Sequence, residues 1–204
     1  MTPPNSTDSI EWAVAHCALP GQEVSGDRHL VQPHDRGVLL AVVDGIGHGP
    51  EATWAADLAV EALRQQPGDS VLNLIKRSHA ALHQTRGVVL TAVVFDEPDR
   101  TVTWCGVGNV EGMLVRNDAV QEHTLLRGGT VGASLPPLHA GVVPVQPGDL
   151  LILASDGIRP DYERDLPVKG SPQRIADHIL GKYFKGTDDA CVLVTRFLDK
   201  ETHA

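Results

Sequence analysis

The chain is poor in aromatic residues and in positive charge. Phe, Trp and Tyr make up 4% of its 204 residues, so a hydrophobic core has to be built mainly from Val, Leu, Ile and Ala. Lys and Arg number 17 against 26 Asp and Glu, which gives a formal net charge of −9. This excess of negative charge argues against nucleic acid and against an anionic membrane surface as partners.

Cysteines are few, and long apolar runs are absent. No run reaches the roughly 18–20 apolar residues that span a bilayer, and the polar start MTPPNSTDSI does not resemble a secretory signal. Cys17, Cys105 and Cys191 lie far apart in strand-like runs, which indicates reduced core thiols in a cytoplasmic protein. We expect residues 1–9 to form a flexible tail and residues 10–204 to form one domain.

Strand-like segments dominate the rest of the chain. Apolar and β-branched runs between short turn signals predict strands in 10–19, 37–43, 87–96, 100–108, 111–117, 119–126, 139–146, 149–155 and 190–198. Short turns favour antiparallel pairing, because parallel strands need long crossovers. Apolar residues recur at helical spacing in 51–65, 70–84 and 171–184. Asp69 or Ser70 would cap the second helix and Ser171 the third.

This order of segments predicts an α+β fold. Several strands are apolar almost throughout, which indicates burial on both faces. Two antiparallel sheets packed together, with helices over their outer faces, would bury such strands in a four-layer α-β-β-α sandwich. The segment 127–138 is too rich in Gly and Pro for regular structure, and we expect an ordered loop there.

Aspartates occur where several predicted strands end or begin. Asp44 directly follows the run LLAVV and Asp156 follows LLILAS, and each precedes a glycine. Asp27 lies in SGD, whereas Asp188 and Asp189 come just before the last strand. Because the end of one strand lies beside the beginning of its antiparallel neighbour, these carboxylates can gather at one rim of the sheets.

Such a group of carboxylates needs a positive charge. Like charges in a small volume raise one another's pKa values or force the site apart. Apart from Arg28 next to Asp27, no Lys or Arg adjoins these aspartates in the sequence. Mg²⁺ or Mn²⁺ with all-oxygen ligation meets the need. Asp44 is therefore a candidate metal ligand, and Gly45 is a candidate ligand through its backbone carbonyl.

Five blocks occur in an order that resembles a known family. SGD, VVDGIGHGPEA, GVGNVEG, ILASDGI and TDDACVLV are similar to motifs of the metal-dependent protein phosphatases (PPM). The likeness is to the bacterial serine phosphatases, and closest to the small stress-response phosphatases of the RsbX type. Within GVGNVEG we expect a hairpin turn with Asn109 in a left-handed conformation.

The resemblance implies the same α-β-β-α sandwich, with two Mn²⁺ or Mg²⁺ ions at one end of it. One ligand would bridge both ions, and another would act through bound water. The implied ligands are Asp44 (bridging), Gly45 (through its carbonyl), Asp27 (through water), Asp156 and Asp188, with Asp189 as a second choice.

The resemblance also implies an activity. It is hydrolysis of phosphoserine or phosphothreonine by direct attack of a metal-bridging hydroxide, with a phosphorylated STAS-domain stress-response protein as substrate. Ile46 stands where eukaryotic members carry histidine, and His48, two positions later, is the candidate general acid. The alternatives are that His48 orders the loop or caps the start of the helix 51–65. Arg28 adjoins Asp27, but the surrounding pattern does not match the eukaryotic arginine that holds phosphate, so that role stays unassigned.

Two other functions remain open at this point. One is a catalytically silent binding module on the same fold that sequesters a regulatory partner, which missing ligands would favour. The other is a phosphate- or nucleotide-binding protein that uses the glycine turn before the helix 51–65. The second is disfavoured, since Asp44 would repel phosphate and no phosphate-loop lysine follows.

Overall fold

The computed structural model describes residue 7 and residues 9–116 and 121–199. Sheet A contains β1 (Ile10–Cys17), β6 (Glu111–Val115), β7 (Gln121–His123), β10 (Leu150–Ala154) and β11 (Ala190–Phe197). Sheet B contains β2 (Asp27–His34), β3 (Gly37–Gly45), β4 (Val88–Asp96), β5 (Thr101–Val107), β8 (Leu126–Arg127) and β9 (Gly141–Pro144). The strand orders are β1-β11-β10-β6-β7 in sheet A and β2-β3-β4-β5-β8 in sheet B, where β9 also pairs with β5.

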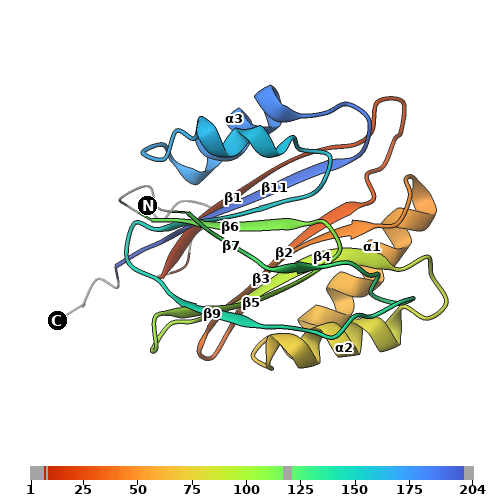
Figure 1. Ribbon diagram of the computed structural model, residues 1–204, viewed down its shortest axis with the longest axis horizontal. Coiled ribbons are helices and arrows are strands. Elements are labelled where there is room, and N and C mark those ends of the chain that lie inside the picture. Colours follow the sequence, from red (N-terminus) through yellow and green to blue (C-terminus); the bar gives the residue numbers. More distant parts are fainter. Residues whose placement is uncertain (1–6, 8, 117–120, 200–204) are drawn as a thin grey trace.

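The two sheets lie face to face, with helices on both outer sides (Figure 1). Helices α1 (Pro50–Arg64) and α2 (Val71–Ala81) cover sheet B, and α3 (Pro172–Tyr183) covers sheet A. A short 3₁₀ helix, η1 (Pro160–Arg164), contacts α3. The predicted four-layer α-β-β-α fold is therefore confirmed.

Strand β3 explains why some runs are apolar throughout. Leu39, Ala41 and Val43 belong to the core beneath α1 and α2, whereas Leu40 and Val42 belong to the core between the sheets. Successive side chains of a strand point to opposite faces, so a strand between two cores needs an apolar residue at every position. That burial holds the end of β3 firmly in place.

The helices begin where their caps predict. Ser70 Oγ accepts a hydrogen bond from the Asn73 N–H (3.3 Å), and Ser171 Oγ accepts one from the Arg174 N–H (3.4 Å). Ser70 rather than Asp69 is thus the cap of α2. In α1 the side chains facing sheet B are small, so the helix packs closely on the strands; Ala52, Ala55, Ala56 and Ala59 are each fully buried.

The predictions missed strand β2 at the edge of sheet B. Its sequence DRHLVQPH contains no apolar run, and several of its side chains are only half-buried. An edge strand pairs on one side only, here with β3, so it tolerates polar residues and Pro33. The pattern of alternating burial was therefore too weak to predict it.

The predicted strand 119–126 was wrong as a single element. Residues 119–120 lie outside the described part of the chain, and the remainder forms β7 in sheet A and β8 in sheet B. Strand β8 pairs with β5 in parallel, with Leu126 opposite Gly106, so sheet B is not purely antiparallel. The segment 127–138 is mostly loop, as expected, with Val131 bridged to Val88.

The packed chain begins before Ile10. Ser9 is buried, and its carbonyl accepts a hydrogen bond from the Leu198 N–H at 2.9 Å; the rest of the predicted tail, apart from Thr7, lies outside the described residues. The cysteines are free thiols, and Cys105 and Cys191 lie in the core as predicted, whereas Cys17 is only half-buried. No helix in the described part of the chain is long and apolar enough to cross a membrane.

Candidate active site

Strands β2 and β3 bring two aspartates together. Asp27, the first residue of β2, is the register partner of Asp44 in β3. Two glycines allow helix α1 to start against these strand ends. A Cβ on Gly45 would lie 2.2 Å from the Ala52 carbonyl oxygen, and a Cβ on Gly26 would lie 2.9 Å from the Ala52 Cβ. Any larger residue would push α1 away from the two aspartates.

Sheet A supplies the other carboxylates. Asp156 follows β10, and Asp188 and Asp189 directly precede β11, its antiparallel neighbour. The loops carrying them touch, since a Cβ on Gly157 would lie 1.9 Å from the Asp189 carbonyl oxygen. The antiparallel pairing therefore gathers the sheet A carboxylates at one end of these strands, as the sequence predicts.

The acids of the two sheets meet at a shared rim. Ser155 Oγ, from the end of β10, donates a hydrogen bond to Asp27 Oδ2 at 2.6 Å. Beside this link lies an open pocket of about 430 Å³. Its lining comes from both sheets and from the loop after β8, and consists of Asp44, Ile46, Gly47, Val89, Gly108, Asn109, Gly128, Gly129, Asp156 and Asp188.

The sequence-predicted site residues divide into two groups. Asp44, Asp156 and Asp188 are half-buried and line the pocket, whereas Asp27 and Gly45 are buried and do not. The three pocket carboxylates can meet a ligand directly. The roles of the other two as ligands stay predictions.

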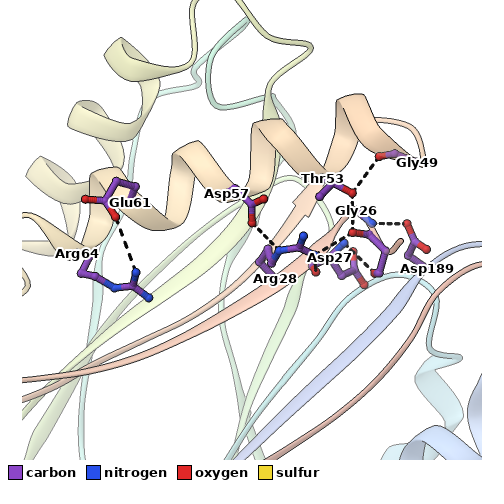
Figure 2. Close-up of polar contacts among 10 residues, drawn as sticks. Gly26, Asp27, Arg28, Gly49, Thr53, Asp57, Glu61, Arg64 and Asp189 are labelled. Carbon is purple, nitrogen blue, oxygen red and sulfur yellow. Dashed lines mark hydrogen bonds and ion pairs between the residues drawn. The ribbon is translucent and has the colours of Figure 1, made fainter. Parts of the chain in front are cut away.

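Asp189 has a different environment from its neighbours. Its Oδ1 accepts a hydrogen bond from the Leu19 N–H (2.7 Å), and its Oδ2 accepts one from the Gly26 N–H (2.6 Å); Figure 2 shows the bond to Gly26. The residue is 3% exposed. Both carboxylate oxygens are thus engaged in holding the segment that leads into β2.

His48 lies in the loop between β3 and α1, and its side chain is exposed. It is not part of the pocket lining. Within the described part of the chain, no hydrogen bond or ion pair orients its ring. The role as general acid implied by the resemblance is not tested by these contacts, and the exposed position of the ring outside the pocket lining disfavours it.

Burial and mutual repulsion raise the pKa values of two of the clustered carboxylates. Burial raises the pKa of Asp44 to about 9, with further contributions from Asp27, Asp156 and other nearby carboxylates. Burial also raises the pKa of Asp27 to about 7, against the lowering effect of the Ser155 hydrogen bond. Among the described residues, no Lys or Arg side chain forms an ion pair with any of these carboxylates. A cluster of carboxylates with this charge favours a bound cation.

The oxygen ligands of the pocket fit a Mg²⁺ or Mn²⁺ ion that retains some of its water ligands. In the described residues, no group of three His, Cys, Asp or Glu side chains is placed to hold one ion by itself. Mg²⁺ commonly binds through one or two carboxylates and retains several waters. The pocket carboxylates Asp44, Asp156 and Asp188 offer such oxygen ligands, and nothing softer than oxygen lies among them.

Three residues of the site were missed from the sequence. Asn109 Nδ2 donates a hydrogen bond to Asp156 Oδ2 at 2.7 Å, and Lys185 Nζ donates one to the Asp156 backbone carbonyl. The expected hairpin in GVGNVEG was wrong, because β5 lies in sheet B and β6 in sheet A, so this segment crosses between the sheets. Its left-handed residue is Gly108 (φ 94°) and not Asn109. Ser155 adjoins Asp156 in the sequence, but only the fold shows its bond to the opposite sheet.

Comparisons with known proteins agree with this geometry. The phosphoserine phosphatase RsbX of Bacillus subtilis (strain 168) is 22% identical over 173 residues, which cover 84% of this chain and 87% of that protein. A chain from the bacterial stressosome, described as a modular system adapted to control secondary messenger signalling, is 28% identical. It has a TM-score of 0.84, with 92% of this chain and 99% of that one covered.

Two solved structures with metal ions share the fold. RsbX in complex with magnesium has a TM-score of 0.85 at 22% identity, and 95% of this chain and 98% of that one are covered. The catalytic domain of the serine/threonine phosphatase PstP with two manganese ions has a TM-score of 0.75 at 17% identity, with 94% and 99% covered.

The four-layer fold of this chain is the fold of these phosphatase structures. Residues 34–198 match the model of the stage II sporulation protein E family (SpoIIE). The chain therefore belongs to the SpoIIE family. The phosphoserine phosphatase among its relatives and the magnesium and manganese in its structural neighbours agree with the predicted class of enzyme and with its predicted Mg²⁺ or Mn²⁺ cofactor.

Proposed function

We propose that this chain removes phosphate from phosphoserine or phosphothreonine on a signalling protein, with Mg²⁺ or Mn²⁺ at the rim pocket. The observation that carries the proposal is the convergence of Asp44, Asp156 and Asp188 on one open pocket, where no ion pair from the described residues compensates their charge. Family membership and the phosphoserine phosphatase RsbX among its relatives support the same activity.

The pocket carboxylates Asp44, Asp156 and Asp188 would hold the ions, together with the Gly45 carbonyl. Asp27 lies further in, bonded to Ser155, and would act through water. Bound ions would supply a water of lowered pKa and would neutralise charge on the phosphate.

The remaining residues of the site keep these ligands in position. Asn109 fixes the orientation of the Asp156 carboxylate through its 2.7 Å hydrogen bond. We assign Asp189 a structural role, in which it accepts hydrogen bonds from two backbone N–H groups, and not the role of a metal ligand. Such support matters because catalytic groups a fraction of an ångström out of place lose much of their effect.

We further propose that the substrate is a phosphorylated STAS-domain protein that acts in stress signalling in the cytoplasm. The pocket is open at the surface, so a phosphorylated side chain on a loop of a folded protein can enter it. The likeness to RsbX and to a stressosome chain supports this class of partner. Because remote contacts would help to position the phosphate, we expect much weaker activity on short phosphopeptides than on that protein.

The site also bears on the alternative of a silent binding module. Loss of ligands would favour a module without turnover, yet Asp44, Asp156 and Asp188 are all present and all line the pocket. We therefore favour the active enzyme.

The test is phosphate release from p-nitrophenyl phosphate with Mn²⁺, with Mg²⁺ and with chelator. We expect metal-dependent turnover in the wild type and its loss in Asp44→Asn. Asp99→Asn changes an exposed aspartate in the β4–β5 turn and should behave as the wild type. If neither p-nitrophenyl phosphate nor a phosphorylated STAS-domain protein is turned over by the folded wild type, the binding module replaces the enzyme.

A further inference from the structure

One arginine at the pocket has no part in the site described above. Arg86 lies in the loop between α2 and β4, and its Nη1 atom is 3.0 Å from the position of a Cβ on Gly47, a residue of the pocket lining. The Ile46 N–H donates a hydrogen bond to the Gly87 carbonyl at 3.1 Å, which ties the two loops together. Arg86 is not itself part of the pocket lining, but its guanidinium stands beside Gly47, which is, and we call it the rim arginine.

Only part of the hydrogen-bonding capacity of the rim arginine is used within the described residues. Its Nη2 pairs with Glu51 in the first turn of α1. Both side chains are more than half exposed, so this pair adds little to stability. No hydrogen bond within the described part of the chain engages Nη1 or Nε of Arg86. The guanidinium keeps two kinds of donor available on the side of Gly47.

Another arginine near the carboxylates is already engaged. Arg28 Nη1 donates to the backbone carbonyls of Ser25 and Asp27 (2.8 Å each), and its Nε donates to Asp57 at 2.6 Å. Figure 2 shows Arg28 between Asp57 of α1 and the chain at Asp27. Its contacts run along β2 and α1, and none of them joins Arg28 to a residue of the pocket lining. Arg28 thus braces the helix against the strand.

The other cationic side chains nearby, Lys185 and Arg127, are less well placed than Arg86 to contact a ligand in the pocket. Lys185 Nζ is bonded to the Asp156 backbone carbonyl, on the sheet A side of the pocket. Arg127 precedes the pocket residue Gly128, but in the described residues no contact joins its side chain to the pocket. Within the described residues, Arg86 is thus the arginine with unpaired donors next to the pocket lining, whereas Lys185 is held on the other side by the Asp156 backbone carbonyl.

We propose that Arg86 holds the phosphate group of the substrate at the pocket rim. The inference rests on the proposed function. A phosphoserine phosphate carries roughly −1.5 to −2 charge at pH 7 and must approach Asp44, Asp156 and Asp188. A guanidinium fork offers parallel donors to two phosphate oxygens and keeps its charge at every working pH.

The test compares Arg86→Ala with two matched variants. Arg64→Ala removes an arginine of similar exposure from the far end of α1, where it pairs with Glu61 (Figure 2). Glu51→Gln removes the partner of Arg86 and leaves the arginine in place. The readouts are the KM for p-nitrophenyl phosphate and the inhibition constant of inorganic phosphate, both with Mn²⁺.

We expect Arg86→Ala to raise both constants about tenfold or more, as loss of a charge-assisted hydrogen bond does. Arg86→Lys keeps the charge without the fork and should be intermediate, and it stands in if Arg86→Ala does not fold. Arg64→Ala and Glu51→Gln should stay within about twofold of the wild type, as is usual for exposed ion pairs.

Two results would overturn the inference. Equal effects of Arg86→Ala and Glu51→Gln would mean that the arginine only orders the start of α1. Unchanged KM and phosphate inhibition in a folded Arg86 variant would mean that it does not touch the phosphate. Failure of the proposed function is distinct, because it would appear as absent turnover in the wild type itself.

Discussion

Asp188 and Asp189 are adjacent in the chain, but their carboxylates face different surroundings. Asp188 lines the pocket, whereas Asp189 is buried and accepts hydrogen bonds from the Leu19 and Gly26 N–H groups. Asp188 Oδ1 in turn accepts a hydrogen bond from the Asp189 N–H at 2.9 Å. The first residue of the pair is thus placed for a ligand and the second for the fold.

This difference predicts opposite effects of the same substitution. Asp189→Asn places an amide where two backbone donors need acceptors, so we expect the free energy of unfolding to fall by about 1–3 kcal/mol. Asp188→Asn removes a negative charge from a repelling cluster, so stability in chelator should be unchanged or higher while Mn²⁺ affinity falls. Urea denaturation in chelator and calorimetric Mn²⁺ titration measure the two effects. Full stability of Asp189→Asn would contradict the assignment.

Gly157→Ala is predicted to lower the stability of the protein. A Cβ there would lie 1.9 Å from the Asp189 carbonyl oxygen, and such overpacking costs about 1–3 kcal/mol or more. Gly181 is the matched control, since it lies inside α3 with no neighbouring atom within 4 Å of a Cβ. Gly181→Ala should raise stability by up to about 1 kcal/mol through helix propensity. Thermal unfolding checks both, and equal effects would show that the loops do not touch.

His79 is predicted to position the loop that borders the pocket. Its Nδ1 accepts a hydrogen bond from the Gly132 N–H at 2.8 Å, and Gly128 and Gly129 of that loop line the pocket. His79→Ala leaves this donor without its partner, so we expect kcat/KM to fall several-fold and the Gly132 amide to exchange faster.

Two variants separate this role from general destabilisation. His79→Asn provides a side-chain oxygen near the position of Nδ1 and should restore much of the activity. His83→Ala alters the ring that packs edge-on against His79 and should leave the Gly132 hydrogen bond intact. If His83→Ala lowers kcat/KM as much as His79→Ala, the hydrogen bond is not what positions the loop.

His48 is predicted to contribute little to the chemical step. The side chain is exposed and outside the pocket lining, whereas a general acid must come within hydrogen-bond reach of the leaving oxygen. We expect kcat of His48→Gln to stay within about threefold of the wild type, against the roughly 10²–10⁴-fold that a general acid contributes. A larger loss, with the basic limb of the pH–rate profile removed, would restore His48 as the acid.

Local patterns were enough for much of the fold and part of the site. The apolar runs before Asp44 and Asp156 mark buried strands, and the caps Ser70 and Ser171 mark helix starts, because burial and capping depend on residues close in sequence. The edge strand β2 escaped prediction, since a strand that pairs on one side only, with half-buried polar side chains, has no clear period.

By itself the sequence determined the four-layer architecture and the gathering of acids at strand ends. Only the tertiary structure decided which acids face the pocket. Asp188 and Asp189 have the same side chain and adjacent positions, and their roles differ because Leu19 and Gly26 reach one of them from far along the chain. The place of Arg86 beside Gly47 was likewise decided by the packing of two loops. Contacts between distant segments carry no local signal, so they follow from the fold alone.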